Sequence, residues 1–246
     1  MKKTLVAFCC LALLVFSQSA AFAQITDEER AEGFVSLFNG QDLTGWEGNT
    51  AVWRVENGVI VGQTTAEGPA SITYNQFLVR KGEEYDDFVL RFDIKCTPGS
   101  GNSGMQIRSW MNPDANRPFS VFGYQADFDG AHAYSGIFYG EGFRGIILSQ
   151  RGQEAKIEPG QRQSMEVRRF ADGDALKREL KVDDWNTYEV TAKDFTFTNK
   201  INGHVMSIFT DEDPTLRKST GILAIQAHVG PPMKVEVRNI RIKKLK

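Results

Sequence analysis

The sequence predicts an all-β fold, an antiparallel two-sheet sandwich or jelly roll with one or two short helices. Short apolar stretches alternate with polar residues along most of the chain, and turn signals separate them. Three of these turns are Asn-Gly dipeptides, at positions 39–40, 57–58 and 202–203, which favour tight hairpins. Helix candidates are few: residues 26–29 fit a capping box, and residues 172–181 form a second short candidate.

The amino terminus has the pattern of a secretory signal peptide. A basic start is followed by an apolar run and by the small-residue pattern Ala-Phe-Ala at 21–23, so cleavage after residue 23 is expected. Residues 24–246 then form a single domain, exported to the periplasm or the extracellular space, without a membrane span. Cys9 and Cys10 lie in the leader, which leaves Cys96 and no intrachain disulfide.

Composition excludes some classes of partner. The chain has 29 Lys and Arg against 31 Asp and Glu, and this balance does not favour nucleic acid or an anionic membrane. The three histidines lack the spacing of a zinc site, and neither a nucleophile elbow nor a phosphate-binding loop is present. The oligomeric state stays open.

A glycine-rich turn at residues 97–101 precedes a strand that carries several hydrogen-bonding side chains. We expect this strand to pair with residues 88–95 as a hairpin or a neighbouring strand. Alternation from Asn102 would place Gln106 and Arg108 on one face. A buried row of donors with no carboxylate beside it suggests an outside ligand, although Arg108 could instead pair with a carboxylate from another strand.

The middle of the chain alternates again. Residues 122–128 set Tyr124 on one face and Gln125 and Asp127 on the other. Residues 110–120 contain two prolines and are expected to form a loop, and residues 150–169 an exposed excursion. The last third returns to strands and ends in an alternating segment at 235–242.

Seven segments, in this order, resemble the 3-keto-disaccharide hydrolase domain family, whose fold is similar to that of concanavalin A-like lectins and glucanases. They are FVSLFNGQDLTGW at 34–46, NSGMQIR at 102–108, GYQAD at 123–127, DWNTY at 184–188, ING at 201–203, LAIQAHVGPPM at 223–233 and VRNIRI at 237–242. The resemblance implies a jelly roll whose concave sheet binds carbohydrate. It also implies cleavage of glycosides already oxidised to a ketone at sugar carbon 3.

Such a substrate changes what the protein must supply. The ketone acidifies the hydrogen at C2, so a base can remove it, the group at C1 can be eliminated, and water can then add to the enone. The site needs one base, donors for the enolate oxygen and an acid for the leaving group.

Four residues are the catalytic candidates. Arg108 could bind the ketone or enolate oxygen, and Asp127 could act as the base or orient a partner. Glu141 lies in a glycine-flanked segment that we expect to be a flexible loop able to close over substrate, and it could be the acid. His228 could shuttle protons, because histidine titrates near neutral pH. The alternatives are a structural ion pair for Arg108, a surface carboxylate near a turn for Asp127 and a packing residue for His228.

Substrate contacts are expected from amides and from aromatic rings on which sugars can stack. The candidates are Asn102, Gln106, Trp110, Tyr124, Gln125, Tyr139 and Gln226. Asp127, Asp129 and nearby carbonyls could hold calcium, although no cofactor is certain.

Two other functions remain open at this point. A non-catalytic lectin-like carbohydrate-binding module would use the same amides and rings without a group that titrates near neutral pH. A conventional glucanase would need two carboxylates converging on one bond.

Overall fold

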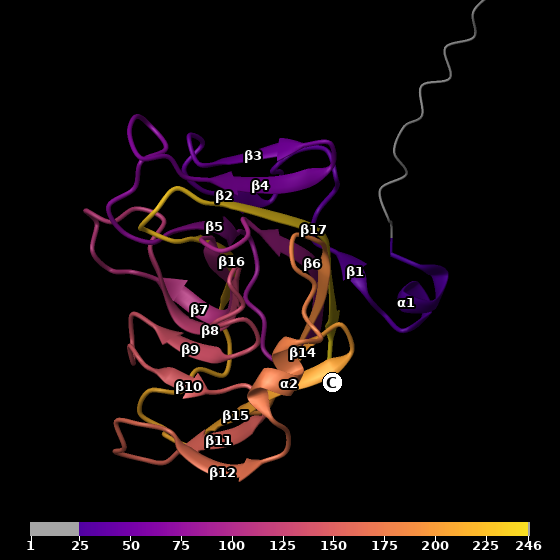
Figure 1. Ribbon diagram of the computed structural model, residues 1–246, viewed down its shortest axis with the longest axis vertical. Helices are drawn as coiled ribbons and strands as arrows, with labels where there is room; N and C mark the ends of the chain where they lie inside the picture. Colours follow the sequence, from indigo (N-terminus) through magenta and orange to yellow (C-terminus); the bar gives the residue numbers. More distant parts are fainter. Residues whose placement is uncertain (1–24, 246) are drawn as a thin grey trace, which may run out of the picture.

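The structure, a computed structural model, describes residues 25–245 as two β-sheets packed face to face (Figure 1). The signal peptide expected at residues 1–23 lies outside this range. The two helices are a single turn or little more, α1 (Asp27–Ala31) and α2 (Gly173–Lys177). No helix within residues 25–245 is long and apolar enough to cross a membrane.

The larger sheet has ten strands, and one pair of neighbours, β11 with β15, is parallel while the others are antiparallel. Its order is β12 (Met165–Arg169), β11 (Gln153–Ile157), β15 (His204–Asp211), β14 (Thr196–Ile201), β13 (Asn186–Lys193), β6 (Phe88–Cys96), β17 (Lys234–Lys244), β4 (Val59–Gln63) and β3 (Trp53–Glu56), with β1 (Val35–Ser36) paired to β17.

The smaller sheet has seven strands, and all its neighbours are antiparallel. Its order is β10 (Ile147–Ser149), β9 (Phe138–Glu141), β8 (Val121–Asp129), β7 (Asn102–Met111), β16 (Ile222–Ala227), β5 (Gln76–Arg80) and β2 (Trp46–Glu47). These two antiparallel-rich sheets confirm the predicted all-β jelly roll.

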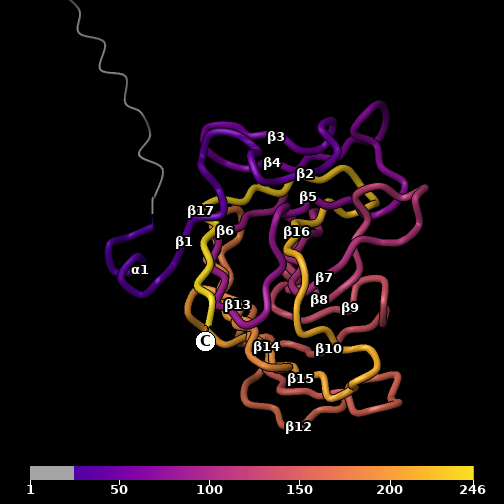
Figure 2. Tube along the Cα trace, turned by 180° about the vertical axis from the view of Figure 1, so that it is seen from behind, coloured from indigo at the N-terminus to yellow at the C-terminus, as the bar shows by residue number. Residues whose placement is uncertain are grey.

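The larger sheet curves around the smaller one. In Figure 1 it runs from β12, β11 and β15 at the bottom, past β14 and β6, to β4 and β3 at the top, and Figure 2 shows the same enclosure from behind. The core lies between the sheets, where Tyr124, Ala126 and Phe128 of β8 are at most 1% exposed. Because side chains alternate across a strand, the residues between them face away from the core, on the outer face of the smaller sheet.

Two of the predicted Asn-Gly turns connect hairpins. Between β3 and β4, Asn57 and Gly58 have φ values of 48° and 74°, and between β14 and β15, Asn202 and Gly203 have values of 50° and 85°. Asparagine and glycine tolerate this left-handed backbone better than other residues, which is why the dipeptide marks the turn. The predicted capping box of α1 is also formed, since Thr26 and Glu29 exchange backbone and side-chain hydrogen bonds.

One local prediction was wrong. The turn at residues 97–101 does not join a hairpin: β6 pairs with β13 and β17 in the larger sheet, whereas β7 pairs with β8 and β16 in the smaller one. The turn therefore carries the chain from one layer to the other. The segment expected as an exposed excursion at 150–169 contains β11 and β12, which extend the larger sheet at its edge, and every residue of β12 is exposed.

Arg108 does not point to the outer face, as strict alternation predicted. A bulge interrupts the register between Ile107 and Trp110, and Arg108 itself has a φ of 44°. Its side chain is fully buried, and its guanidinium donates to the Asp87 carboxylate at 2.6 Å and to the carbonyl of Asp86 at 2.8 Å. The alternative left open by the sequence, an internal ion pair, is therefore the correct one.

The remaining donors of Arg108 bind two further loops. The guanidinium donates to the carbonyl of Asp194, in the turn between β13 and β14, and to that of Lys218, in the loop before β16, at 3.5 Å. It also lies over the ring of Phe197, with 5.2 Å between the guanidinium carbon and the ring centroid. One side chain of the smaller sheet thus binds three separate loops.

We predict that Arg108→Met lowers the free energy of unfolding by about 3 to 5 kcal/mol, the usual cost of removing one partner from a buried ion pair. Methionine keeps the apolar stem but removes the guanidinium from three carbonyl groups and from Asp87, which keeps only the backbone N–H of Asp194 as a donor. Urea denaturation followed by circular dichroism measures this loss. Arg162→Met, at an exposed position, is the control, and a loss below about 1 kcal/mol in Arg108→Met would contradict the prediction.

Candidate active site

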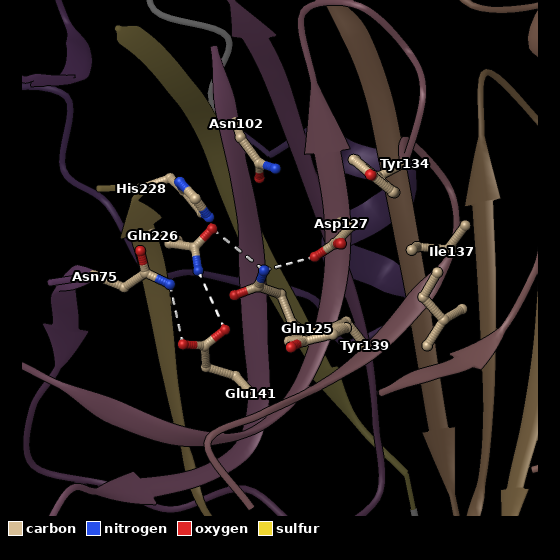
Figure 3. A pocket seen from close by; sticks show the side chains of 11 residues that line it. Asn75, Asn102, Gln125, Asp127, Tyr134, Ile137, Tyr139, Glu141, Gln226 and His228 are labelled. Atoms are coloured by element: carbon tan, nitrogen blue, oxygen red, sulfur yellow. Dashed lines mark hydrogen bonds between the residues drawn. The ribbon is translucent and has the colours of Figure 1, made fainter. Parts of the chain in front are cut away.

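A cleft of about 490 Å³ lies on the outer face of the smaller sheet. Strands β16, β7, β8, β9 and β10, which are neighbours in that sheet, contribute most of its walls. Figure 3 shows its side chains. The lining residues are Asn75, Asn102, Gln125, Asp127, Tyr134, Ile137, Tyr139, Glu141, Ile147, Gln226 and His228.

Asp127 is one of two carboxyl groups in the cleft, and it is only 6% exposed. Burial raises the pKa of Asp127 well above its ordinary value, and the negative charges of Glu141 and Asp129 raise it further. A hydrogen bond of 2.5 Å from Gln125 Nε2 to Asp127 Oδ1 opposes this shift. The other oxygen, Oδ2, has no hydrogen-bond partner among the described residues and is available to a ligand.

Glu141, the last residue of β9, is the second carboxyl group. Burial raises the pKa of Glu141, while a hydrogen bond from Asn75 and the positive charge of His228 act in the opposite direction. Asn75 Nδ2 donates to Oε1 at 3.0 Å, and the amide of Asn75 is held in turn by the backbone N–H of Val229. Gln226 Nε2 reaches Oε2 at 3.5 Å, a long contact that leaves this oxygen able to carry a proton.

A relay of amide groups connects the two carboxyls beneath the cleft. Ser109 Oγ donates to Gln106 Oε1 at 2.7 Å, and Gln106 Nε2 donates to Gln125 Oε1 at 2.6 Å. The amide nitrogen of Gln125 is therefore the end that faces Asp127 and, at 3.3 Å, Gln226 Oε1. Gln106 is fully buried and does not line the cleft, so the structure makes it a support for Gln125 rather than a substrate contact.

Four polar side chains of the cleft have no hydrogen bond to any described residue: those of Asn102, Tyr134, Tyr139 and His228. Figure 3 shows Asn102 and Tyr134 around Asp127, and His228 on the far side of Gln226. Burial raises the pKa of Tyr139, and the charges of both carboxyl groups raise it further, so its hydroxyl stays protonated at neutral pH. These groups can donate to, or accept from, a hydroxyl-rich ligand.

The structure therefore gathers seven of the predicted site residues in one cleft: Asn102, Gln125, Asp127, Tyr139, Glu141, Gln226 and His228. Alternation along β8 and β16 is sufficient to explain why the glutamines of these strands and Asp127 share a face. Arg108 is excluded from the cleft because the bulge in β7 turns it into the core.

Two predicted aromatic contacts also lie elsewhere. Tyr124 is fully buried between the sheets, and its hydroxyl donates to Asp211 at 2.7 Å. Trp110 packs edge-on against Phe122 and Phe143, with centroids 6.4 and 5.4 Å away, and does not line the cleft. Both rings serve packing, which was the alternative for any aromatic residue of this chain.

The segment after Glu141 is fixed in place, contrary to the expected flexible loop. Arg144 is 3% exposed and forms ion pairs with Asp211 at 2.9 Å and Asp213 at 3.6 Å. Phe143 packs on Tyr124 with a centroid distance of 5.2 Å. Glu141 is thus held in a strand whose following turn is pinned to the core, which suits a preorganised group better than a closing lid.

Asn75, Tyr134, Ile137 and Ile147 line the cleft but were missed in the sequence. Asn75 directly precedes β5 and Tyr134 lies in a turn, so neither belongs to an alternating pattern. The turn that contains Tyr134 could have been predicted from Asp129, because an aspartate side chain often accepts backbone N–H groups of the residues that follow it. Its carboxylate accepts the backbone N–H groups of Ala133, Tyr134 and Ser135 at 2.8 to 3.0 Å.

These same bonds bear on the expected calcium site. The oxygens of Asp129 face backbone donors, an environment that favours a structural carboxylate over a metal ligand. Within residues 25–245 no group of three or more His, Cys, Asp or Glu side chains is arranged to hold a metal ion. Asp129 shapes the turn that brings Tyr134 to the cleft.

The fold is a concanavalin A-like jelly roll that carries a polar cleft on the outer face of its smaller sheet. The profile of the 3-keto-alpha-glucoside-1,2-lyase-like domain matches residues 33–243, so the chain belongs to this family. No curated protein matches the chain in sequence.

Solved structures share the fold at low sequence identity. A provisionally named glycosyl hydrolase from Parabacteroides distasonis is 24% identical, with a TM-score of 0.60 over 91% of this chain and 99% of that one. The β-glucanase of Bacillus licheniformis is 12% identical, with a TM-score of 0.50 over 87% and 99% of the two chains. A carbohydrate-binding module from Bacillus subtilis is 14% identical, with a TM-score of 0.50 over 80% and 94%.

We predict that Asp127→Asn stabilises the protein at pH 8, because asparagine removes a buried charge and keeps the shape. Since the folded pKa lies above the unfolded one, wild-type stability falls as the pH rises from about 4 through the folded pKa and then levels off. The gain should be about 1.4 kcal/mol for each unit by which the pKa is raised, and it should vanish below about pH 4.

Urea denaturation at pH 4, 6 and 8 measures this difference. Asp86→Asn, at an exposed carboxylate, is the matched control and should show no gain that grows with pH. A variant at position 127 that is less stable than the wild type at pH 8 would refute the assignment of a costly buried charge.

Proposed function

We propose that this protein cleaves glycosides whose sugar is oxidised to a ketone at carbon 3. The observation that carries the proposal is a pair of carboxyl groups with raised pKa values, the buried Asp127 and the partly buried Glu141, which face one cleft with several uncommitted polar groups. Carboxyl groups whose pKa is raised by burial are suited to exchange protons nearer neutral pH. Membership of the 3-keto-alpha-glucoside-1,2-lyase-like family supports the same chemistry.

Asp127 would act as the base. Its Oδ2 has no partner among the described residues, and its raised pKa makes the ionised form a stronger base than an ordinary aspartate. The base removes the proton from C2, and the electrons of that C–H bond form an enolate with the ketone at C3. Asn102 and Tyr139, both uncommitted donors of the cleft, are suited to hydrogen-bond the enolate oxygen.

Glu141 would act as the acid. As the enolate collapses, the bond between C1 and the leaving oxygen breaks, a C1–C2 double bond forms, and the leaving oxygen takes a proton from Glu141. Water then adds to the resulting enone, its oxygen to C1 and its proton to C2, so the overall reaction is a hydrolysis without any oxidant. His228 would exchange protons between the cleft and the solvent.

A conventional glucanase would use the two carboxyl groups differently. Such an enzyme places them about 5 to 9.5 Å apart across the glycosidic bond and needs no ketone at C3. Here Gln226 and Gln125 connect Glu141 and Asp127 by hydrogen bonds (Figure 3). Cleavage of an unoxidised glucoside would favour a glucanase over the proposed function.

We also propose that the protein works outside the cytoplasm, after removal of residues 1–23. The supporting observation is the basic, apolar and small-residue order of that segment. Cys96, which is buried, is the one cysteine among the described residues, so the fold stays independent of the redox conditions met after export.

The first test compares a glucoside with its 3-keto counterpart. We expect release of the leaving group from the keto sugar only, because C2 of the unoxidised sugar carries no acidified hydrogen. Asp127→Asn should lower kcat by about 100- to 10,000-fold, the usual contribution of a general base, while the Asp86→Asn control keeps full activity. Binding of both sugars without turnover would leave a lectin-like binding module as the function.

A second test addresses the acid. Glu141→Gln should reduce kcat about 100-fold or more on a 3-keto-glycoside with an alcohol leaving group, which needs a proton to depart. The same variant should lose little on a 3-keto 4-nitrophenyl glycoside, because nitrophenolate leaves without protonation. Glu67→Gln, at an exposed carboxylate, is the control. Equal losses on both substrates would exclude Glu141 as the acid.

A further inference from the structure

A chain of hydrogen bonds leads from the interior of the smaller sheet to one carboxyl group of the cleft. It begins at Ser109, passes through the amides of Gln106 and Gln125, and ends on Asp127 Oδ1. Ser109 is 2% exposed, Gln106 is fully buried, and neither lines the cleft. These two residues can therefore act on a bound ligand only through Gln125.

The chain of hydrogen bonds has one preferred direction. Ser109 carries a single hydroxyl hydrogen, and Gln106 Oε1, at 2.7 Å, is a nearer acceptor for it than the carbonyl of Ile107, at 3.1 Å. Gln106 then donates its nitrogen to Gln125 Oε1, and Gln125 donates its nitrogen to the carboxyl group. This nitrogen also donates to Gln226 Oε1 at 3.3 Å, so a reversed Gln125 would bring two amide oxygens together.

Two glycines make room for these side chains. A Cβ on Gly104, in β7, would lie 2.7 Å from Cγ and 3.0 Å from Cδ of Gln125, so a larger residue would displace the amide that contacts the carboxyl group. A Cβ on Gly123, in β8, would overlap Ser109 Oγ. The backbone is thus shaped at both ends of the chain of hydrogen bonds.

The direction of the chain determines which oxygen of Asp127 is suited to hold a proton. Oδ1 accepts the hydrogen bond from Gln125 at 2.5 Å, and protonation of this oxygen would weaken that bond. Oδ2 has no hydrogen-bond partner among the described residues. A proton taken from a ligand is therefore best held on Oδ2, from which it can return to the ligand.

From this geometry we propose that Ser109 and Gln106 are positioning residues, which hold Gln125 against Oδ1 of Asp127 so that Oδ2 takes and returns the proton. This inference rests on the proposed function for the identity of the reaction. In that reaction Oδ2 removes the proton from C2 during elimination and gives it back to C2 when water adds. The oxygen of the water bonds to C1 and the released proton goes to the Glu141 carboxylate, which restores both carboxyl groups.

Other titratable groups also face Asp127. They are Asp129 of the same strand, Tyr139 and Glu141 of β9, Tyr188 of β13, whose hydroxyl donates to the Asp127 carbonyl, Tyr134 of the preceding turn to β9, and His228 after β16. Neither Ser109 nor Gln106 has a hydrogen bond to any of them among the described residues. Substitution at these two positions therefore leaves the charges around Asp127 as they are.

The test is the pKa of Asp127, measured by carbon-13 NMR of its carboxyl group in the ligand-free protein. Gln106→Leu removes the donor that holds Gln125, and a weaker hydrogen bond to the ionised carboxylate should raise the pKa by roughly one pH unit. On a 3-keto-glycoside the acid limb of kcat/KM should move to higher pH by the same amount. Ser109→Ala removes one oxygen and should act in the same direction by less, and it serves if leucine at position 106 prevents folding.

Ser103→Ala is the matched control. Ser103 is a fully buried serine of the same strand, and its hydroxyl donates to the backbone carbonyl of Gln226 at 2.7 Å. This variant should lower stability and leave the pKa of Asp127 unchanged. General loosening of the site would admit water and lower that pKa, because burial is the main cause of its rise. An unchanged or lowered pKa in the variants at positions 106 and 109 would overturn the proposal.

The NMR titration needs no turnover, so it separates this proposal from the proposed function. If the wild type cleaves no 3-keto-glycoside while the variants raise the pKa of Asp127, the positioning of Gln125 stands and the catalytic proposal fails. If the wild type cleaves the substrate and the pKa of Asp127 does not respond to the variants, the catalytic proposal stands and the positioning role fails.

Discussion

The guanidinium of Arg108 is the constraint on which the arrangement of the two sheets depends. A fully buried cation is tolerated only when its donors are matched, and here they reach one carboxylate and three carbonyl groups from separate loops. The bulge that turns Arg108 inward also resets the register of β7. Before the bulge the register of β7 with β8 is regular, and alternation alone presents Asn102 to the cleft.

The chemistry of the cleft follows from a different kind of constraint. An amide side chain donates through its nitrogen and accepts through its oxygen. The hydrogen bonds from Ser109 to Gln106 and from Gln106 to Gln125 Oε1 therefore orient Gln125 so that its nitrogen donates to Asp127. Burial and hydrogen bonding act on each carboxyl group in opposite directions, and burial prevails in both. Both carboxyl groups therefore have raised pKa values. Their positions are fixed by neighbouring strands and by the turn that contains Arg144, which is paired with Asp211.

The sequence was sufficient for much of this protein because alternation and turn chemistry are local. The sandwich, the Asn-Gly hairpins and the shared face of Gln125 and Asp127 all depend on neighbours in the chain. The errors arose where distant partners decide. A bulge turned Arg108 towards the core, and β6 pairs within the larger sheet rather than with β7. Tyr124 is different, because alternation along residues 122–128 already placed it on the face opposite Gln125 and Asp127. Asn75 and Ile147 reach the cleft only through tertiary packing, which no local pattern records.

The cleft also has a consequence for how the protein acquires activity. Its residues lie between Asn75 and His228 and come from five strands that follow the order β10, β9, β8, β7 and β16 in space. Pairing of β7 with β16 joins segments more than a hundred residues apart, and such high contact order slows folding. The cleft is therefore complete only once β7 and β16 have paired. Recovery of ligand binding after refolding would report closure of the whole sheet and coincide with the last kinetic phase.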